Sequence, residues 1–315
     1  MEPTKPSKVQ TPDRDGLLQA AQIIRAGGTV AVPTETVYGL AARADDDGAV
    51  AGIYRAKGRP DFNPLIVHVP DVTAAHRLAV FDDRANALAD AFWPGPLTMV
   101  LPRREDAGLA AAVSAGLPTV ALRCPAHPVM LALLKNCGYP LAAPSANRSG
   151  GVSPTSPAHV ADSLGDRVDL ILDGGATDQG IESTIVALRD DGSWAILRPG
   201  PVTEAQIAGV LGGVSAAMTS SKIEAPGQLA SHYAPGKPVR LEAADAAADE
   251  FMIGFGKVAG AVSLSPTGDL AEAAARLYAC LHLGATDEQP RIAIAPIPHD
   301  GIGVAINDRL RRAAA

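Results

Sequence analysis

The sequence predicts an α/β protein built from two units, and three observations lead to this fold class. Segments with apolar residues at helical spacing alternate with short runs rich in Val, Ile and Leu along most of the chain. The length of 315 residues exceeds what one compact core usually needs. Residues 212–237 show no sustained period and are rich in Gly, Ser, Ala and Pro, which is typical of a linker. We therefore expect a first unit at 1–211, a linker at 212–237 and a smaller α/β unit at 238–315.

Helix and strand signals follow one another through the first unit. Gly58 ends the second helical pattern, Ser156 before Pro157 is a usual helix start, and Thr203 with Gln206 forms a capping-box pattern. The expected helices lie at 17–25, 49–57, 84–92, 127–137, from 157 onward and at 203–211. The expected strands lie at 29–32, 64–69, 97–102, 119–125, 139–144, 168–173, 183–188 and 194–200. In the second unit the clearest patterns are a helix at 270–283 and a strand at 291–296.

The composition argues against several classes of protein. A formal net charge of −7 disfavours a broad basic surface for nucleic acid, because phosphate neutralisation needs clustered Lys and Arg. The three cysteines form neither a CxxC pair nor a zinc spacing, which favours a reduced intracellular protein. Residues 1–16 lack the apolar core of a signal peptide, and no apolar run reaches membrane-spanning length. We therefore expect a cytoplasmic protein without a membrane segment.

Several well-known catalytic and nucleotide-binding signatures are absent from the sequence. There is no GxxxxGK[ST] phosphate loop, and GFGKVAG at 254–260 has the wrong glycine spacing for a dinucleotide fingerprint. Neither a GxSxG elbow nor an HExxH helix occurs. A hydrolase triad or a zinc protease therefore has no support.

Polar residues follow an apolar strand directly in PTETVYGL, residues 33–40. Gly39 permits unusual dihedral angles, so the pattern fits a simple strand end with a turn. It also fits the polar floor of a ligand pocket, with Thr34 and Thr36 on either side of Glu35.

Cationic side chains occur where an anion could bind. Lys57 and Arg59 at a helix end complement the helix dipole in the simplest interpretation, but they can also converge on one polyanion. Arg123 lies inside a strand, where a buried guanidinium must meet a partner or an anion. His68 alternates with apolar neighbours, so we expect it to be half-buried, as a core histidine or as a ligand contact.

A loop dense in Ser, Asn and Gly follows one of the short strands. In PSANRSGGVSP, the residues Ser145, Asn147, Ser149 and Ser153 offer hydroxyl and amide groups that suit a polar ligand, although an ordinary surface loop has the same composition. The motifs GIESTIV and LRPGP add polar residues at strand ends, where solvated side chains are the usual explanation: Glu182, Ser183, Thr184 and Arg198.

Together these motifs resemble one protein family. In order and spacing, the chain is similar to the YrdC-like L-threonylcarbamoyladenylate synthases in PTETVYGL, AKGRP with NPLIVHV, WPGPLT, APSAN, GIESTIV and LRPGP. This resemblance spans about residues 17–201, and SHYAP at 231–235 with GIGVAINDRLRRAA at 301–314 extends it to the longer, two-domain members. It implies a twisted, mixed α/β sheet of YrdC-like type around a central cavity, followed by a smaller Rossmann-like α/β domain.

The resemblance also implies an activity. Such enzymes combine L-threonine, bicarbonate and ATP into threonylcarbamoyl-AMP and pyrophosphate, and we expect a divalent cation, Mg²⁺, to accompany ATP. A separate transferase complex then moves the threonylcarbamoyl group onto tRNA, so this chain need not bind tRNA directly. Attack of a carbamate oxygen on the α-phosphate brings anions together, which requires cations and positioning more than a nucleophilic side chain.

Roles for individual residues follow from the resemblance. The residues assigned to the triphosphate and the adenylation step are Lys57, Arg59, Ser145 and Asn147. The residues assigned to ATP are Arg59, Asn63, Thr119, Ser145, Ser153 and Arg198. The residues assigned to threonine are Thr36, His68, Arg123, Ala143 and Ser183, with Arg123 as the carboxylate clamp.

By the same resemblance, the linker would lie over the site as a lid, and the C-terminal unit would stabilise or regulate rather than catalyse. One position departs from the family pattern: Ala230 stands where the family commonly carries a tyrosine near the nucleotide.

Two other classes remain open at this stage. An RNA-binding module would show steep, salt-dependent binding to bare RNA. A carbamoyl-transferring maturation factor can contain the same type of domain, but such proteins carry additional cysteine-rich modules, and this chain has no CxxC pair.

Overall fold

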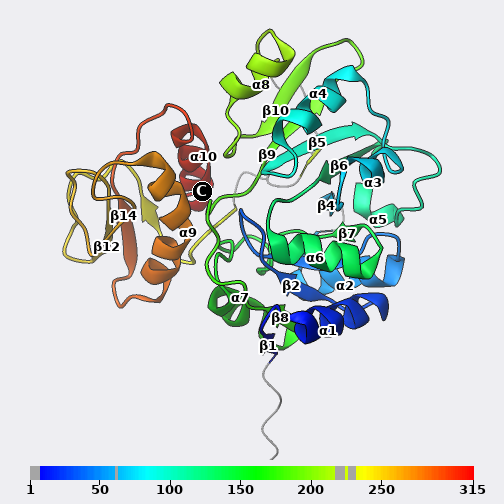
Figure 1. Cartoon of the computed structure of the whole chain (residues 1–315). Helices are drawn as coiled ribbons and strands as arrows, with labels where there is room; N and C mark the ends of the chain where they lie inside the picture. Colours follow the sequence, from blue (N-terminus) through cyan, green and yellow to red (C-terminus); the bar gives the residue numbers. More distant parts are fainter. Residues whose placement is uncertain (1–7, 61–62, 217–223, 226–231) are drawn as a thin grey trace, which may run out of the picture.

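Two β-sheets of unequal size organise the structure, a computed structural model that describes residues 8–60, 63–216, 224–225 and 232–315. Figure 1 shows the sheets in two units, with the last helix and the C-terminus at their junction. The large sheet has ten strands and the small sheet has four. The predicted α/β class and the predicted two-unit architecture are confirmed.

The helices and strands have the following bounds. The helices are α1 (Arg14–Arg25), α2 (Asp47–Lys57), α3 (Val72–His76), α4 (Asp83–Phe92), α5 (Ala111–Ser114), α6 (Pro128–Cys137), α7 (Pro157–Leu164), α8 (Glu204–Leu211), α9 (Leu270–Thr286) and α10 (Gly303–Ala313), with a 3₁₀ turn η1 (Gly165–Arg167). The strands of the large sheet are β1 (Val9–Gln10), β2 (Val30–Val32), β3 (Gly39–Arg43), β4 (Ile66–His68), β5 (Leu97–Pro102), β6 (Thr119–Arg123), β7 (Leu141–Ala142), β8 (Leu170–Leu172), β9 (Thr184–Leu188) and β10 (Trp194–Arg198). The strands of the small sheet are β11 (Val239–Arg240), β12 (Glu250–Gly254), β13 (Val262–Ser263) and β14 (Arg291–Ile294).

The large sheet mixes parallel and antiparallel pairs. Its spatial order is β1-β8-β2-β3-β7-β4-β6-β5-β9-β10, and the pairs β1–β8, β8–β2, β4–β6 and β5–β9 are parallel. In the middle of the sheet, β4 lies beside β6 with His68 opposite Arg123. The pairing therefore brings two residues predicted for the threonine site to the same end of neighbouring strands.

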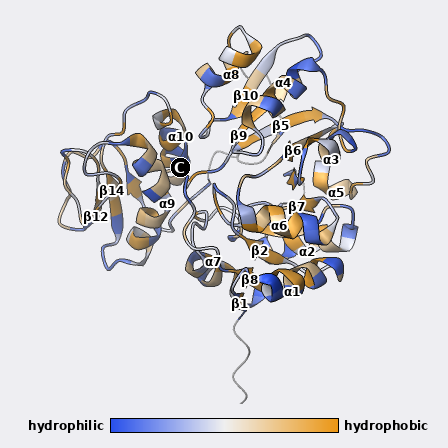
Figure 2. Ribbon diagram, viewed as in Figure 1, coloured by the Kyte–Doolittle hydropathy of each residue, from blue (hydrophilic) through white to orange (hydrophobic). Residues whose placement is uncertain are grey.

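Apolar side chains cover both faces of the large sheet. On one face a single large cluster packs under α2, α4, α7 and α8, and it includes Ala31 and Val67. The other face has two smaller clusters, one under α1 and α6 with Val30 and Val32, the other around Ile66. This division follows the period of two along each strand, since neighbouring residues point to opposite faces. Figure 2 shows the hydrophobic residues along the strands and the polar residues in the outer loops.

The small sheet is parallel throughout and packs against α9 and α10. Its order is β11-β14-β12-β13. The apolar cluster of this unit also contains Val37, Val152 and Ile181 from the first unit. The two units therefore share a continuous apolar contact, while the finer Rossmann-like description stays a prediction.

Most of the predicted elements are present, and their ends follow local capping. The helix expected at 17–25 starts at Arg14, because the side chain of Asp13 accepts a hydrogen bond from the Gly16 N–H and caps it. The capping box of Thr203 with Gln206 is present. No helix among the described residues is long and apolar enough to cross a membrane.

Candidate active site

Several of the residues predicted for the site line one small cavity beside the large sheet. It lies where the two smaller apolar clusters meet, since Ala143 belongs to the one and Ile66 to the other. Its volume is about 50 Å³. The lining residues are Thr36, Val37, Arg59, Ile66, Arg123, Ala143, Pro144, Ser145, Glu182, Ser183, Arg198, His232 and Tyr233.

The structure divides the predicted site residues into two groups. Those that line the cavity are Thr36, Arg59, Arg123, Ala143, Ser145, Ser183 and Arg198. Those that lie outside its lining are Lys57, Asn63, His68, Thr119, Asn147 and Ser153. The second group supports or extends the first, as the contacts below describe.

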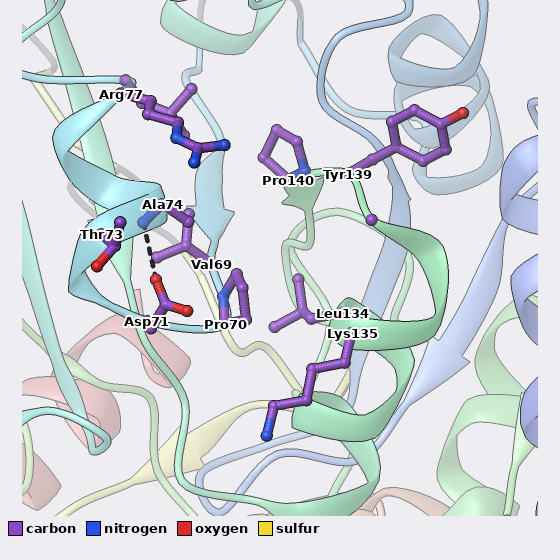
Figure 3. A pocket seen from close by; sticks show the side chains of 12 residues that line it. Val69, Pro70, Asp71, Thr73, Ala74, Arg77, Leu134, Lys135, Tyr139 and Pro140 are labelled. Carbon is purple, nitrogen blue, oxygen red and sulfur yellow. Dashed lines mark hydrogen bonds between the residues drawn. The ribbon is translucent and has the colours of Figure 1, made fainter.

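A larger cavity of about 450 Å³ lies elsewhere, between α3 and the end of α6 (Figure 3). The Asp71 carboxylate there caps α3 by accepting from the Ala74 N–H at 2.8 Å. Its cations, Arg77 and Lys135, are exposed. Buried polar groups do not converge there as they do on the small cavity, so we place the candidate site at the small cavity.

Arg123 at the end of β6 is held by a buried carboxylate. Its Nη2 donates to Oε1 of Glu35 at 2.6 Å, its Nη1 to the Thr36 hydroxyl at 3.0 Å, and its Nε to the Gly95 carbonyl at 3.2 Å. Burial opposes ionisation of Glu35, but the Arg123 guanidinium outweighs it and lowers the pKa of this carboxyl. These contacts fix the orientation of Arg123, which lines the cavity.

The turn between β2 and β3 is organised by its own hydroxyl groups. The Thr34 hydroxyl donates to the Val37 carbonyl at 2.6 Å and accepts from the N–H groups of Thr36 and Val37 at 3.2 Å. Gly39 does not take the unusual dihedral angles that its sequence position suggested, since it is the first residue of β3 and has no positive φ. A Cβ atom at this position would lie 3.3 Å from the Cβ of Ala143, a tight contact that would require a small shift of its neighbour.

His68 is fully buried rather than half-buried, with 2% of its surface exposed. Burial, together with the nearby Arg123, lowers the pKa of His68 to about 3, so its ring is neutral at physiological pH. Its Nδ1 has no hydrogen-bond partner among the described residues. The expectation of partial exposure was wrong because apolar clusters cover both faces of this part of the sheet.

Lys57 binds the backbone of the loop that follows β7. Its ammonium group donates to the carbonyls of Ser145 at 2.5 Å and Asn147 at 2.6 Å. Burial lowers the pKa of this lysine well below its ordinary value. The Asn147 amide in turn donates to the carbonyls of Arg148 and Gly151. Lys57 and Asn147 therefore set the path of the loop that presents Ser145.

Arg59, Asn63 and Thr119 lie near the opposite end of the central strands. The Arg59 guanidinium donates to the carbonyls of Asn63 at 3.3 Å and Pro64 at 3.0 Å. The β4–β6 register pairs Ile66 with Ala121, and continuing it by two residues places Thr119 beside Pro64. Oδ1 of Asn63 has no hydrogen-bond partner among the described residues.

Arg198 at the end of β10 folds back onto β9. Its Nε and Nη2 donate to the Ser183 carbonyl at 3.1 and 3.0 Å, and Nη2 also reaches the Ser183 hydroxyl at 3.2 Å. That hydroxyl exchanges a 2.8 Å hydrogen bond with Thr98. The usual explanation of such strand ends as solvated does not apply here, because Ser183, Thr184 and Arg198 are all buried.

Glu182 is also buried, and it receives three donors. Its carboxylate accepts from the Ser153 hydroxyl at 2.6 Å, the Tyr278 hydroxyl at 2.8 Å and Nε of Arg309 at 2.8 Å. Burial opposes ionisation, but Arg309 and Arg198 outweigh it and lower the pKa of Glu182 to about 2. A residue that the sequence indicated as solvated is thus an ion held between the two units.

The segment at 232–234 closes the cavity on its remaining side. The Ala234 N–H donates to the Gly150 carbonyl at 2.8 Å, and the His232 N–H donates to the Arg312 carbonyl at 3.2 Å. Tyr233 has a φ of +64°, a left-handed conformation that is unfavourable for a large side chain. Its hydroxyl and Nδ1 of His232 are buried without a hydrogen-bond partner among the described residues.

Cations dominate the lining of the cavity. Arg59, Arg123 and Arg198 face it, whereas Glu182 is the carboxylate among the lining residues that the structure describes. Polar atoms of two lining residues, Nδ1 of His232 and the Tyr233 hydroxyl, have no hydrogen-bond partner among the described residues. Because buried polar groups almost always find a partner, this arrangement is chemically suited to bind an anionic, polar ligand.

The sequence did not indicate several residues in and around this candidate site. No site role was expected for Glu182, Tyr278 or Arg309. A signal existed for Arg309, which lies within the GIGVAINDRLRRAA motif. For Tyr278 there was none, since it occurs in an ordinary apolar helical pattern.

Two family models and several relatives match most of the chain. One model, described as "Telomere recombination" and covering the Sua5, YciO and YrdC proteins, matches residues 22–200, and the model "Threonylcarbamoyl-AMP synthase, C-terminal domain" matches residues 202–315. The chain is 39% identical to the threonylcarbamoyl-AMP synthase of Bacillus subtilis, over 95% of this chain and 92% of that protein. It is 38% identical to the synthase of Pyrococcus abyssi, over 94% and 93% respectively.

A solved structure extends the similarity to the whole fold. The crystal structure of Pyrococcus abyssi Sua5 complexed with L-threonine superposes with a TM-score of 0.87 at 35% identity, covering 95% of this chain and 94% of that one. Because both family models and nearly full-length relatives match, the chain belongs to the threonylcarbamoyl-AMP synthase family, as a two-domain member.

Proposed function

We propose that the chain makes threonylcarbamoyl-AMP and pyrophosphate from L-threonine, bicarbonate and ATP. The observation that carries this proposal is the convergence of Arg59, Arg123 and Arg198 on one cavity, because the reaction brings together a carboxylate, a carbamate and a triphosphate. The names of the relatives and the L-threonine in the Pyrococcus abyssi crystal structure support it.

The threonine site, in this proposal, lies at the ends of β4 and β6. Arg123 would clamp the threonine carboxylate, since its guanidinium is already charged and oriented by Glu35. The unpartnered Nδ1 of His68 and the Thr36 hydroxyl would meet polar groups of the amino acid. Ala143 and Ser183 would complete the walls.

ATP would lie towards the opposite end of the same strands. Arg59, Ser145 and Arg198 line the cavity and would contact the phosphates. The unpartnered Oδ1 of Asn63 and the hydroxyl of Thr119 would contact the nucleoside portion, and Ser153 would contribute through Glu182. Since β4 and β6 are parallel, one pair of strands would orient both substrates.

The chemistry needs positioning more than a protein nucleophile. The threonine amine and bicarbonate form a carbamate with loss of water, and a carbamate oxygen then attacks the α-phosphate of ATP, which releases pyrophosphate. Arg59 and the loop of Ser145 and Asn147 would hold the α-phosphate in line with this oxygen. Lys57 would act through the loop, because its ammonium group is bound to the loop carbonyls.

A divalent cation, Mg²⁺ in this proposal, would enter with ATP. Among the described residues, no group of three or more His, Cys, Asp or Glu side chains is placed to hold a metal ion. Mg²⁺ commonly binds through substrate phosphates and water with few protein ligands. We therefore expect phosphate oxygens to supply much of its coordination, and the ion to neutralise part of the triphosphate charge.

Substrate entry would require an opening of the site. A cavity of about 50 Å³ cannot hold ATP, since pockets for ligands of such size are roughly 300–1,000 Å³. His232 and Tyr233 fill the remaining side, so their segment would move as part of the lid expected at 212–237. The contact expected near Ala230 lies outside the described residues.

The product would serve a later step in tRNA modification. We propose that a separate transferase complex takes the threonylcarbamoyl group to tRNA, and that this chain acts in the cytoplasm without binding tRNA directly. The net charge of −7 supports this division of labour.

Pyrophosphate release by the purified full chain tests the proposal. With ATP and Mg²⁺, we expect release only when both L-threonine and bicarbonate are present. Lys57→Ala should lower kcat/KM at least ~100-fold, because the loop that positions the phosphate loses its support. Lys135→Ala is the matched control, since Lys135 is exposed on α6, and it should behave like the unmodified chain.

Two results would count against the proposal. Pyrophosphate release that is indifferent to threonine would exclude the synthase reaction. A chain that releases none but binds bare RNA with a steep salt dependence would favour the RNA-binding alternative. Thermal melting of Lys57→Ala separates loss of activity from loss of folding.

A further inference from the structure

The carboxylate of Glu182 lies in the candidate site but is held mainly by the C-terminal unit. Tyr278 on α9 and Arg309 on α10 both bind its Oε2 at 2.8 Å, while Ser153 of the first unit binds Oε1. Tyr278 and Arg309 are completely buried. Two hydrogen bonds thus join the site to helices nearly a hundred residues or more away in the chain.

Close packing keeps Glu182 against these helices. Gly180, two residues earlier, has a φ of +70°, and a Cβ atom there would lie 2.4 Å from the carbonyl oxygen of Ala274 on α9. The side chain of Ile181 belongs to the apolar cluster of the C-terminal unit. The segment that carries Glu182 therefore packs against α9 through its backbone as well as through the Glu182 side chain.

Arg309 has a fixed position between several partners. Its Nη2 donates to the Pro199 carbonyl at 2.9 Å, directly after Arg198, and its Nη1 donates to Asp308 at 2.7 Å. The guanidinium carbon lies 5.4 Å from the ring centre of Tyr233. A single side chain of α10 therefore contacts the Glu182 carboxylate, the end of β10 and the segment that closes the cavity.

Because Glu182 is negatively charged, its contact with Arg309 affects how well the cavity can bind phosphates. Glu182 and Arg198 both line the cavity in which the ATP phosphates would bind. An unpaired carboxylate in this buried place would repel the phosphates and would compete with them for Arg198, whereas a carboxylate paired with Arg309 is neutralised. The positive charge of Arg59 and Arg198 is then left for the ligand.

We propose that Arg309 and Tyr278 are positioning residues of the synthase site. They hold Glu182 in place and neutralise its charge. Through Glu182 they fix the Ser153 hydroxyl and leave Arg198 available, on the side of the cavity where the nucleotide would bind. Apart from His232 and Tyr233, the described lining residues belong to the first unit, and the C-terminal unit contributes through its hydrogen bonds to Glu182. This inference rests on the proposed function, because ATP is the anion that this face would meet.

Charge rescue gives a sharp test. In the full chain, Arg309→Met should raise the KM for ATP about tenfold or more, since it leaves a buried carboxylate unpaired beside the phosphates. The KM for L-threonine should change by less than about threefold, because Arg123 has its own partner in Glu35. Adding Glu182→Gln to Arg309→Met removes the unpaired charge and should recover most of the lost ATP affinity.

Two further variants test whether the effect on ATP comes from the contacts of Glu182. Tyr278→Phe removes one hydrogen bond without burying a charge, and it should raise the KM for ATP by about fivefold. Arg311→Met is the matched control on the same helix, since the Arg311 side chain is exposed. It should leave the KM for ATP within about twofold, as expected for an exposed cation.

The outcomes separate this inference from the proposed function. Each variant is checked by thermal melting, and ATP affinity is also measured by calorimetric titration, which needs no turnover. An unchanged ATP affinity in Arg309→Met, an equal rise in both KM values, or no recovery on adding Glu182→Gln would overturn the inference. If Arg309→Met does not fold, the ATP affinities of the double variant and of Tyr278→Phe test the inference instead. An ATP affinity of Tyr278→Phe equal to that of the unmodified chain would then overturn it. A chain that binds ATP but lacks threonine-dependent pyrophosphate release would overturn the proposed function instead.

Discussion

Two buried carboxylates at the candidate site, Glu35 and Glu182, are each paired with a buried arginine. Arg123 is 4% exposed and Glu35 is 6% exposed, with 2.6 Å between Nη2 and Oε1. Removal of one partner from such a pair is costly because the other charge stays buried. Glu35 is thus a positioning residue for the proposed threonine clamp.

Replacement of Glu35 by Gln tests this role. The variant should raise the KM for L-threonine by about tenfold, because Arg123 loses the charged hydrogen bond that orients it. The KM for ATP should change much less, since Glu35 contacts Arg123 and the Ala126 N–H rather than the nucleotide end. Steady-state kinetics with each substrate varied in turn provides the measurement.

A surface ion pair supplies the control for Glu35→Gln. Asp45 pairs with Arg43 at 2.9 Å, and both side chains are partly exposed. Asp45→Asn should leave both KM values unchanged, as exposed pairs contribute little. If Glu35→Gln proves as harmless as Asp45→Asn, the orienting role of Glu35 is wrong.

The environment of a single residue was predicted well where it depends on neighbours in the sequence, and poorly where it depends on residues far away in the chain. The cost of burying a lone arginine correctly required a partner for Arg123, but nothing near it in the sequence identifies Glu35, 88 positions away. Glu182 was interpreted as solvated because the helices that cover it, α9 and α10, follow it by roughly a hundred residues in sequence. Burial of a polar strand end is a property of tertiary packing, which local patterns do not contain.

At the scale of elements, α7 and α9 meet through two stacked histidines. The rings of His159 and His282 lie 3.9 Å apart, and Nε2 of His282 lies 3.1 Å from the Ser153 carbonyl oxygen. Burial and the neighbouring His282 lower the pKa of His159 to about 4. This contact between the two units therefore depends on neutral imidazole rings.

Acidification should weaken the protein through this contact. An unfolded histidine titrates near pH 6.5, so between about pH 6.5 and 4 the unfolded chain binds a proton that folded His159 does not. The stabilisation is complete above pH 6.5 and is lost as the pH falls through this window. His159→Asn should reduce the loss of unfolding free energy between pH 7 and pH 5 by on the order of 1 kcal/mol.

Urea denaturation at the two pH values measures this effect. The control is His299→Asn, since His299 is exposed and far from α7 in the sequence. If His159→Asn loses as much stability on acidification as the unmodified chain, the histidine contact has no such role.

Elements with strong caps or strong apolar runs were predictable, and weakly patterned ones were not. The capped helices α7 and α8 lie where the sequence places them. The strand β3 was missed because GLAAR has no β-branched residue, and its extended form depends on pairing with β2. The helix α10 was noticed only as part of a motif.

At the scale of the whole molecule, the site depends on both units. The first unit provides the central strands and the loop of Ser145, whereas α9 and α10 hold Glu182. The segment of His232 and Tyr233 closes the space between them. The sequence predicted two units and a lid between them, but not that a carboxylate of the site would be shared.

The most direct test of the proposed reaction is detection of its product. The full chain would be incubated with L-threonine, ¹³C-bicarbonate, ATP and Mg²⁺, and the nucleotides would be analysed by mass spectrometry. We expect an AMP adduct that contains one threonine and one ¹³C-labelled carbonyl, and its amount should match the pyrophosphate released. The account would be contradicted if ATP were converted to AMP or ADP and no AMP adduct containing threonine and the ¹³C label were found.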